Sequence, residues 1–288
     1  MSATTWTEVD PAELAPVVLV VGGALTTPGS YRPMAAALRA RGAAEVVIAP
    51  VYLPDWILAS VRGLGPVTTR VGRALLEAGA RSAADPGSRG APILYVGHSG
   101  GGIVGRLLTS PEPFEGRRLG ASGRIGALVT LGTPHLVDDD TRWGRPMAAV
   151  GIRFVNRHVP GACFAPTTGY LAVASRCVAV HDPARDTRSR YVRRVYEEFQ
   201  PAPDQPIVAG DGVVPLGSAL LPGARHIVLD DALHGPGVHT PWYGHEGRLE
   251  AWWPVALEVW RDALQARQER RRQPARPGDP ASGDAAPA

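Results

Sequence analysis

One stretch, from Ala91 to Arg106, constrains the fold of this chain more than any other, and it reads APILYVGHSGGGIVGR. The segment Pro92 to Val96 is apolar, with β-branched and aromatic members, which predicts a strand buried on both faces. A tight G-H-S-G-G turn follows at once, and behind it comes an apolar pattern of helical spacing at Ile103, Val104, Leu107 and Leu108. Strand, G-x-S-x-G turn and helix together form the context in which a serine, here Ser99, is presented as a nucleophile.

The glycines around Ser99 have a mechanical reason. A serine on a strained turn needs neighbours without Cβ atoms, so that strand and helix can approach closely. Because the chain holds 34 glycines in 288 residues, an isolated G-x-S-x-G means little, and the flanking strand and helix carry the assignment. His98 is adjacent to Ser99 and points elsewhere, so we expect a structural role for it.

Strands and helices alternate along the rest of the chain. We expect buried strands at 15–21, 46–49, 125–131, 170–175 and 226–229, and helices at 31–41, 66–80 and 246–264. Alternation with short connections predicts an α/β fold with a mostly parallel sheet covered by helices on both faces. Residues 1–14 read as a polar lead-in to a domain spanning 15–266, with insertions at 136–168 and 178–206. From 267 to 288 the chain is rich in Arg, Pro and Ala without periodicity, which predicts a disordered tail.

Composition excludes several classes of function. The chain is 44% hydrophobic and 20% charged with a net charge of only +3, and every one of its 30 basic residues is arginine. A coding bias explains the absence of lysine, and much of the basic excess lies at 267–276, so we expect no nucleic-acid partner. No apolar run is long enough for a membrane span, and no secretory signal is visible, so a cytoplasmic protein with reduced Cys163 and Cys177 is expected.

A serine nucleophile needs a histidine base, which in turn needs a carboxylate to orient it. His234 is best placed as the base, since it follows the strand at 226–229 in a loop; His239 and His245 remain alternatives. Asp211 stands between two glycines in Gly210–Pro215 and is favoured as the acid, with Asp182 and Asp186 as competitors. For the oxyanion hole we expect backbone N–H groups of Gly100 and of the loop at Gly23 and Ala24.

Four segments resemble the lipase and esterase branch of the α/β-hydrolase fold, over about residues 15–264: VVLVVGGAL, YVGHSGGG, ALVTLGTPH and GDGVVPLGSALLPGARHIVLDDALHGP. The resemblance also includes a Y-R-P motif at Tyr31–Pro33. It implies an α/β-hydrolase with a Ser-Asp-His triad. The chain has Gly22-Gly23 where the family often has His-Gly or Pro-Gly, which leaves Ala24 and Leu25 both open. The intervening segment 178–206 keeps Asp182 and Asp186 open.

These observations predict a serine hydrolase that cleaves small-molecule or lipid esters through an acyl-enzyme, without metal or cofactor. A calcium site at Asp138, Asp139 and Asp140 is less favoured than a solvated acidic loop. An acyltransferase or thioesterase with the same triad is the nearest alternative, and a non-catalytic binding protein on this scaffold is another. The apolar residues of 136–168 predict a cap over Ser99. Because they are dispersed, a fixed cap and a preference for short soluble esters are expected.

Overall fold

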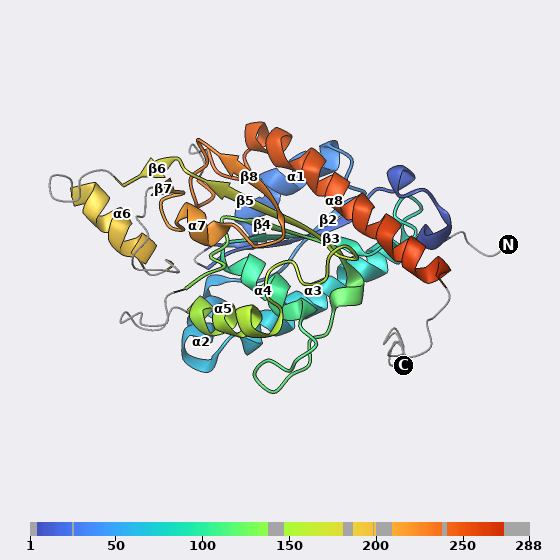
Figure 1. Cartoon of the computed structure of the whole chain (residues 1–288), viewed down its shortest axis with the longest axis horizontal. Coiled ribbons are helices and arrows are strands. Elements are labelled where there is room, and N and C mark those ends of the chain that lie inside the picture. Colours follow the sequence, from blue (N-terminus) through green and yellow to red (C-terminus); the bar gives the residue numbers. More distant parts are fainter. Residues whose placement is uncertain are drawn as a thin grey trace.

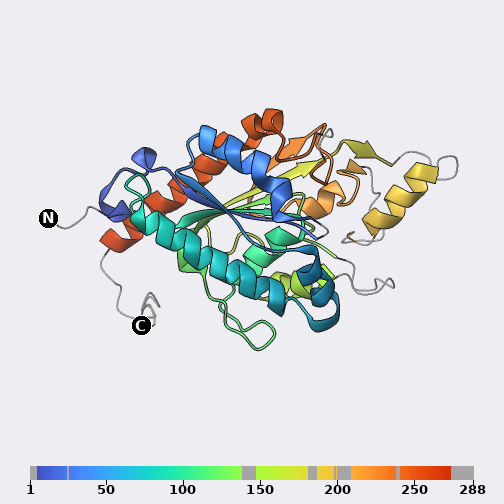
Figure 2. The same cartoon turned by 180° about the vertical axis from the view of Figure 1, so that it is seen from behind.

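A six-stranded parallel sheet forms the centre of the protein (Figures 1 and 2). The computed structural model describes residues 5–24, 26–137, 147–180, 187–197, 199, 209–237 and 241–273. In spatial order the strands are β2 (Glu45–Ile48), β1 (Val17–Val21), β3 (Ile93–His98), β4 (Ile125–Leu131), β5 (Gly169–Ser175) and β8 (Arg225–Leu229). Every neighbouring pair is parallel. A small antiparallel pair, β6 (Val178–Ala179) and β7 (Ala209–Gly210), lies apart from this sheet.

Helices cover both faces of the sheet. Figure 1 shows α1 (Arg32–Ala40) and α8 (Glu246–Arg272) above it. Below it lie α2 (Leu53–Arg62), α3 (Gly65–Ala84), α4 (Gly100–Thr109) and α5 (Met147–His158). The remaining described helices are α6 (Thr187–Glu197), α7 (Leu216–Ala219) and the short 3-10 turns η1 (Trp6–Glu8), η2 (Pro11–Glu13), η3 (Pro28–Tyr31) and η4 (Ser122–Arg124).

The alternation of side chains along each strand builds two cores from one sheet. In β1, Val17, Leu19 and Val21 pack with the α3, α4 and α5 side, whereas Val18 and Val20 pack with α1 and α8. Because both faces are covered, all five residues of β1 are buried, which is why the strand is a continuous apolar run. The predicted α/β class and parallel sheet are confirmed.

Two helices depart from the sequence-based prediction. The helix α2 was not predicted, because only Asp55, Trp56 and Ala59 of its residues face the protein, while its aliphatic side chains face solvent. The helix α8 begins at the predicted residue but continues to Arg272, so the tail predicted from residue 267 was placed too early. The extension is held by Gln268, which is buried and donates to the carbonyl oxygens of Trp6 and Val9.

The expected cap is described only in part. Its helix α5 packs beside α4, and buried Arg106 of α4 donates to the carbonyl oxygen of Val159 at 3.0 Å, just past the end of α5. Residues 138–146 lie outside the described part of the chain, so the cap over Ser99 stays a prediction. Among the described residues no helix is both long enough and apolar enough to cross a membrane. Cys163 and Cys177 are unpaired thiols.

Candidate active site

Ser99 occupies a strained turn between β3 and α4. Its φ of 52° and ψ of −126° lie outside the conformations that a residue with a Cβ usually adopts. The turn is held from two sides: the Ser99 N–H donates to the Leu131 carbonyl oxygen at 2.9 Å, and the Thr133 hydroxyl donates to the Ser99 carbonyl oxygen at 3.0 Å. Strain of this kind persists only where the surroundings enforce it.

The glycines of the turn are required by close backbone contacts. A Cβ at Gly101 would lie 2.3 Å from the Val21 carbonyl oxygen of β1, and one at Gly97 would lie 2.5 Å from the Gly102 Cα. Both distances are too short for real carbon contacts. Helix α4 can therefore lie this close to β3 only with glycine at position 97, and this close to β1 only with glycine at position 101.

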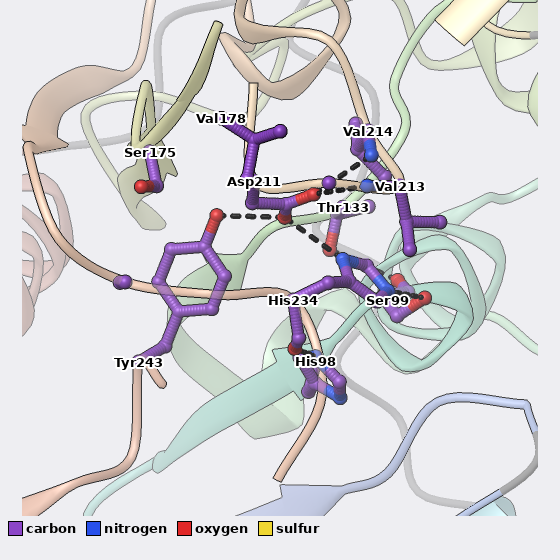
Figure 3. Close-up of polar contacts among 12 residues, drawn as sticks. His98, Ser99, Thr133, Ser175, Val178, Asp211, Val213, Val214, His234 and Tyr243 are labelled. Carbon is purple, nitrogen blue, oxygen red and sulfur yellow. Dashed lines mark hydrogen bonds and ion pairs between the residues drawn. The ribbon is translucent and has the colours of Figure 1, made fainter. Parts of the chain in front are cut away.

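The three residues predicted to form a triad lie within hydrogen-bonding distance of one another (Figure 3). The Ser99 Oγ is 3.0 Å from His234 Nε2, and His234 Nδ1 is 2.8 Å from Asp211 Oδ2. His234 is on the loop that follows β8, and Asp211 follows β7 directly. The Asp211 side chain is 1% exposed and that of His234 is 14% exposed. Asp211 is thus buried, and His234 lies closer to solvent.

The Asp211 carboxylate accepts four hydrogen bonds. Its Oδ1 accepts from the N–H groups of Val213 and Val214 at 3.0 and 2.7 Å, and its Oδ2 accepts from the Tyr243 hydroxyl and from His234, both at 2.8 Å (Figure 3). Burial acts to raise the pKa of Asp211, but the attraction of His234 in its protonated form and the hydrogen bonds from His234, Val214 and Val213 outweigh it, and the pKa is lowered.

A charged carboxylate at Asp211 fixes the tautomer of His234. The carboxylate can only accept, so His234 Nδ1 carries the proton. The lone pair of Nε2 then faces the Ser99 hydroxyl and can accept its proton. The sequence did not predict Tyr243 as a partner of Asp211, and no local motif marks it.

Of the residues left open as alternatives for the base and the acid, the structure describes only His245. It is exposed and stands at the N-cap position of α8. His239, Asp182, Asp186 and Asp138–Asp140 lie outside the described residues, as does Leu25. Among the described residues, no three His, Cys, Asp or Glu side chains are placed to hold a metal ion.

The loop after β1 packs against the turn that holds Ser99. Gly23 lies against the serine, since a Cβ there would be 2.6 Å from the Ser99 Cβ. Its N–H, however, donates to the Tyr31 hydroxyl at 3.0 Å. The expectation that Gly23 itself contributes an oxyanion donor is therefore wrong, because its amide is already engaged. Ala24 and Gly100 remain as candidate donors, and Gly100 opens α4, where the first N–H groups have no partner within the helix.

No family model and no curated protein matches this chain. Among solved structures, it is similar to a lipase of Bacillus licheniformis in its propeptide form, with a TM-score of 0.52 and 14% identity over 85% of this chain. This chain spans 50% of that structure. The present chain has the α/β-hydrolase fold. Weaker similarities are to an esterase of Thermogutta terrifontis (TM-score 0.42, 14% identity, 90% of this chain and 86% of that one). A pyrethroid hydrolase is also similar (TM-score 0.41, 16% identity, 89% of this chain and all 100% of that one).

Within this fold, His98 connects the two loops that flank the serine. Its Nε2 is 2.7 Å from the His234 carbonyl oxygen and must donate to it, so Nδ1 accepts from the Tyr31 hydroxyl at 2.8 Å. The Tyr31 oxygen in turn accepts from the Gly23 N–H. Burial and the charge of His234 lower the pKa of His98 to about 3, so its ring is neutral. His98 thus links the His234 loop to Tyr31, and Tyr31 is the tyrosine of the Y-R-P motif.

Proposed function

We propose that this protein hydrolyses carboxylic esters, with Ser99 as nucleophile, His234 as general base and acid, and Asp211 as the carboxylate that orients His234. The observation that carries the proposal is the unbroken chain from Ser99 Oγ through His234 to Asp211, with contacts of 3.0 and 2.8 Å. The esterase and lipase names of the similar proteins agree with it.

In the first half of the reaction, Ser99 Oγ attacks the ester carbonyl carbon while its proton passes to His234 Nε2. The tetrahedral intermediate then collapses: the bond to the alcohol oxygen breaks, and that oxygen takes the proton from His234. In the second half, water gives its proton to Nε2 and attacks the acyl-enzyme, and Ser99 recovers its proton as the acid leaves. Asp211 stays ionised throughout and stabilises the imidazolium.

The negative charge on the carbonyl oxygen would be met by backbone N–H groups. Gly100 follows the nucleophile at the start of α4, and Ala24 follows Gly23, which touches Ser99. Donors fixed before the reaction stabilise this charge without rearrangement, and removing one costs about 10²- to 10³-fold in kcat.

An acyltransferase or a thioesterase would use the same three residues and differ in the acceptor or leaving group. The direct test is hydrolysis of p-nitrophenyl esters of increasing acyl length by the wild type and by Ser99→Ala. We expect turnover by the wild type and a loss of several orders of magnitude in the variant. No hydrolysis by a folded wild-type protein of any ester in the series would contradict the proposal.

A further inference from the structure

The helix α2 presents an exposed apolar face beside the nucleophile. Among the described residues, ten large hydrophobic side chains are exposed, and five of them lie between residues 52 and 61. These five define the α2 face: Tyr52, Leu53, Ile57, Leu58 and Val61. Ile57 is 57% exposed and Val61 is 80% exposed. Isolated exposed aliphatic residues are ordinary, but a cluster this dense marks an interaction surface.

The spacing of these residues gathers them on one side of the helix. Leu53, Ile57 and Val61 follow one another at intervals of four, which places them in a row. The opposite side of the helix packs against the rest of the protein: Asp55 pairs with Arg70 at 2.7 Å, and Trp56 and Ala59 are buried. Asp55 is the one ionisable side chain between Leu53 and Val61, so the outer face carries no charge over its length.

The α2 face adjoins the proposed catalytic serine. Trp56, on the inner side of the same helix, lies so close to Gly100 that a Cβ there would be 3.1 Å from its ring. Both α2 and Ser99 follow parallel strands at the carboxyl edge of the sheet, and Figures 1 and 2 both show α2 alongside α5. A surface that contacts the α2 face is therefore brought next to Ser99.

A basic groove of about 750 Å³ borders this face. Leu58 belongs to both, and the charged residues lining the groove are Arg62, Arg70, Arg73, Arg117, Asp55 and Glu115. Both acids are already engaged, Asp55 by Arg70 and Glu115 by the N–H groups of Leu64 and Gly65. Within the described part of the chain, Arg62 and Arg73 have no ion-pair partner. An uncharged apolar row flanked by unpaired guanidinium groups is complementary to acyl chains below anionic head groups.

We propose that the α2 face docks the protein onto the surface of an anionic lipid aggregate, with the apolar row against the acyl region and the groove arginines against the head groups. Docking would bring insoluble esters of the lipid surface to Ser99. That use of the lipid as substrate rests on the proposed function, whereas the docking itself does not. Docking of this kind differs from the preference for short soluble esters that the sequence of residues 136–168 predicts.

The test is co-sedimentation of the full-length chain with vesicles of phosphatidylcholine, with and without an equal part of phosphatidylglycerol. Binding to the anionic vesicles is expected, weakened at least about tenfold by Ile57→Ser combined with Val61→Ser. Replacing Arg62 and Arg73 by Gln should weaken binding to the anionic vesicles by about fivefold per arginine, and should thereby remove the preference for them. The matched control is Leu76→Ser on α3, whose side chain is 54% exposed, and it should bind as the wild type does.

Two further measurements separate the possible outcomes. The Ile57→Ser, Val61→Ser protein should hydrolyse soluble p-nitrophenyl acetate at the wild-type rate, and Ser99→Ala should still bind vesicles. Loss of esterase activity in every protein together with intact vesicle binding would therefore overturn the proposed function alone. The docking proposal would be overturned by absence of vesicle binding or by equal binding of the double variant. A wild-type dimer that the double variant disperses would overturn it too, since the face would then bind a second copy.

Discussion

Asp211 shows how a buried carboxylate is kept ionised beside a histidine. Burial alone would favour the neutral acid, but two backbone N–H groups, the Tyr243 hydroxyl and His234 all donate to it. The hydrogen bonds from His234, Val214 and Val213, together with the attraction of His234 in its protonated form, outweigh the cost of burial and lower the pKa of Asp211. The loop residues Gly210 and Gly212 make this possible, since a Cβ at Gly210 would meet the Val214 carbonyl oxygen at 2.3 Å.

Replacing Asp211 by Asn is therefore expected to lower kcat by about 10³- to 10⁴-fold with little change in folding. The amide no longer selects the tautomer that leaves Nε2 free to accept the serine proton. Steady-state hydrolysis of a p-nitrophenyl ester measures the effect, and Asp182→Asn and Asp186→Asn serve as controls that should retain activity. A collapse of activity in either control, with Asp211→Asn unimpaired, would assign the acid to the other loop.

In the proposed mechanism His98 would be a positioning residue, because it contacts the His234 carbonyl oxygen and the Tyr31 hydroxyl that binds the Gly23 N–H. His98→Ala breaks both contacts and is expected to lower kcat by roughly 10- to 100-fold, which is the usual effect of losing a residue that orients a catalytic group by a hydrogen bond. His98→Gln offers a donor for the His234 carbonyl oxygen and an acceptor for Tyr31, so it should restore much of the loss. Equal kcat values for His98→Ala and the wild type would remove this role.

At the scale of elements, sequence reasoning succeeded where apolar residues face the core. The strands β1, β3, β4 and β5 and the helices α1, α3 and α4 were all anticipated, because burial dictates their pattern. It failed at α2, where Leu53, Ile57, Leu58 and Val61 face outward and only Asp55, Trp56 and Ala59 are buried. The contacts of Tyr243 with Asp211 and of His98 with Tyr31 join residues 32 and 67 positions apart, and no local pattern encodes them.

The last turns of α8 give a prediction about truncation. A chain that ends at Ala266 loses the bonds of Gln268 to Trp6 and Val9 and those of Arg267 to Gly123 and Ile125. Its Tm should fall by about 5 °C or more. A chain that ends at Gln273 keeps these bonds, and its Tm should change by no more than about 1 °C. Thermal unfolding followed by circular dichroism compares the two, and equal Tm values would show that the extension contributes nothing.

For the whole molecule, buried neutral histidines predict how stability depends on pH. The pKa of His98 is lowered to about 3 from 6.5, and that of His135 is also lowered, in both cases chiefly by burial. Below pH 6.5 the unfolded chain binds protons that the folded chain excludes. The contribution of His98 is thus complete above pH 6.5 and declines as the pH falls towards 3, by about 1.4 kcal/mol per pH unit. His135 contributes in the same direction.

Urea unfolding at pH 7.5 and pH 5 measures this dependence. We expect the free energy of unfolding to fall between the two, and to fall less in His98→Gln, which has no proton to bind there. The control is His158→Gln, since His158 is exposed on α5. An unchanged dependence in His98→Gln would contradict a neutral buried ring at this position.

The central claim is that Ser99 is a nucleophile activated by His234. Intact-mass measurement of the full-length protein after reaction with a fluorophosphonate tests it without assuming any substrate. The account predicts one covalent adduct on the wild type, located on the peptide containing Ser99, and none on Ser99→Ala under the same conditions. A folded wild-type protein that stays unmodified, or a Ser99→Ala variant that reacts at the wild-type rate, would contradict it.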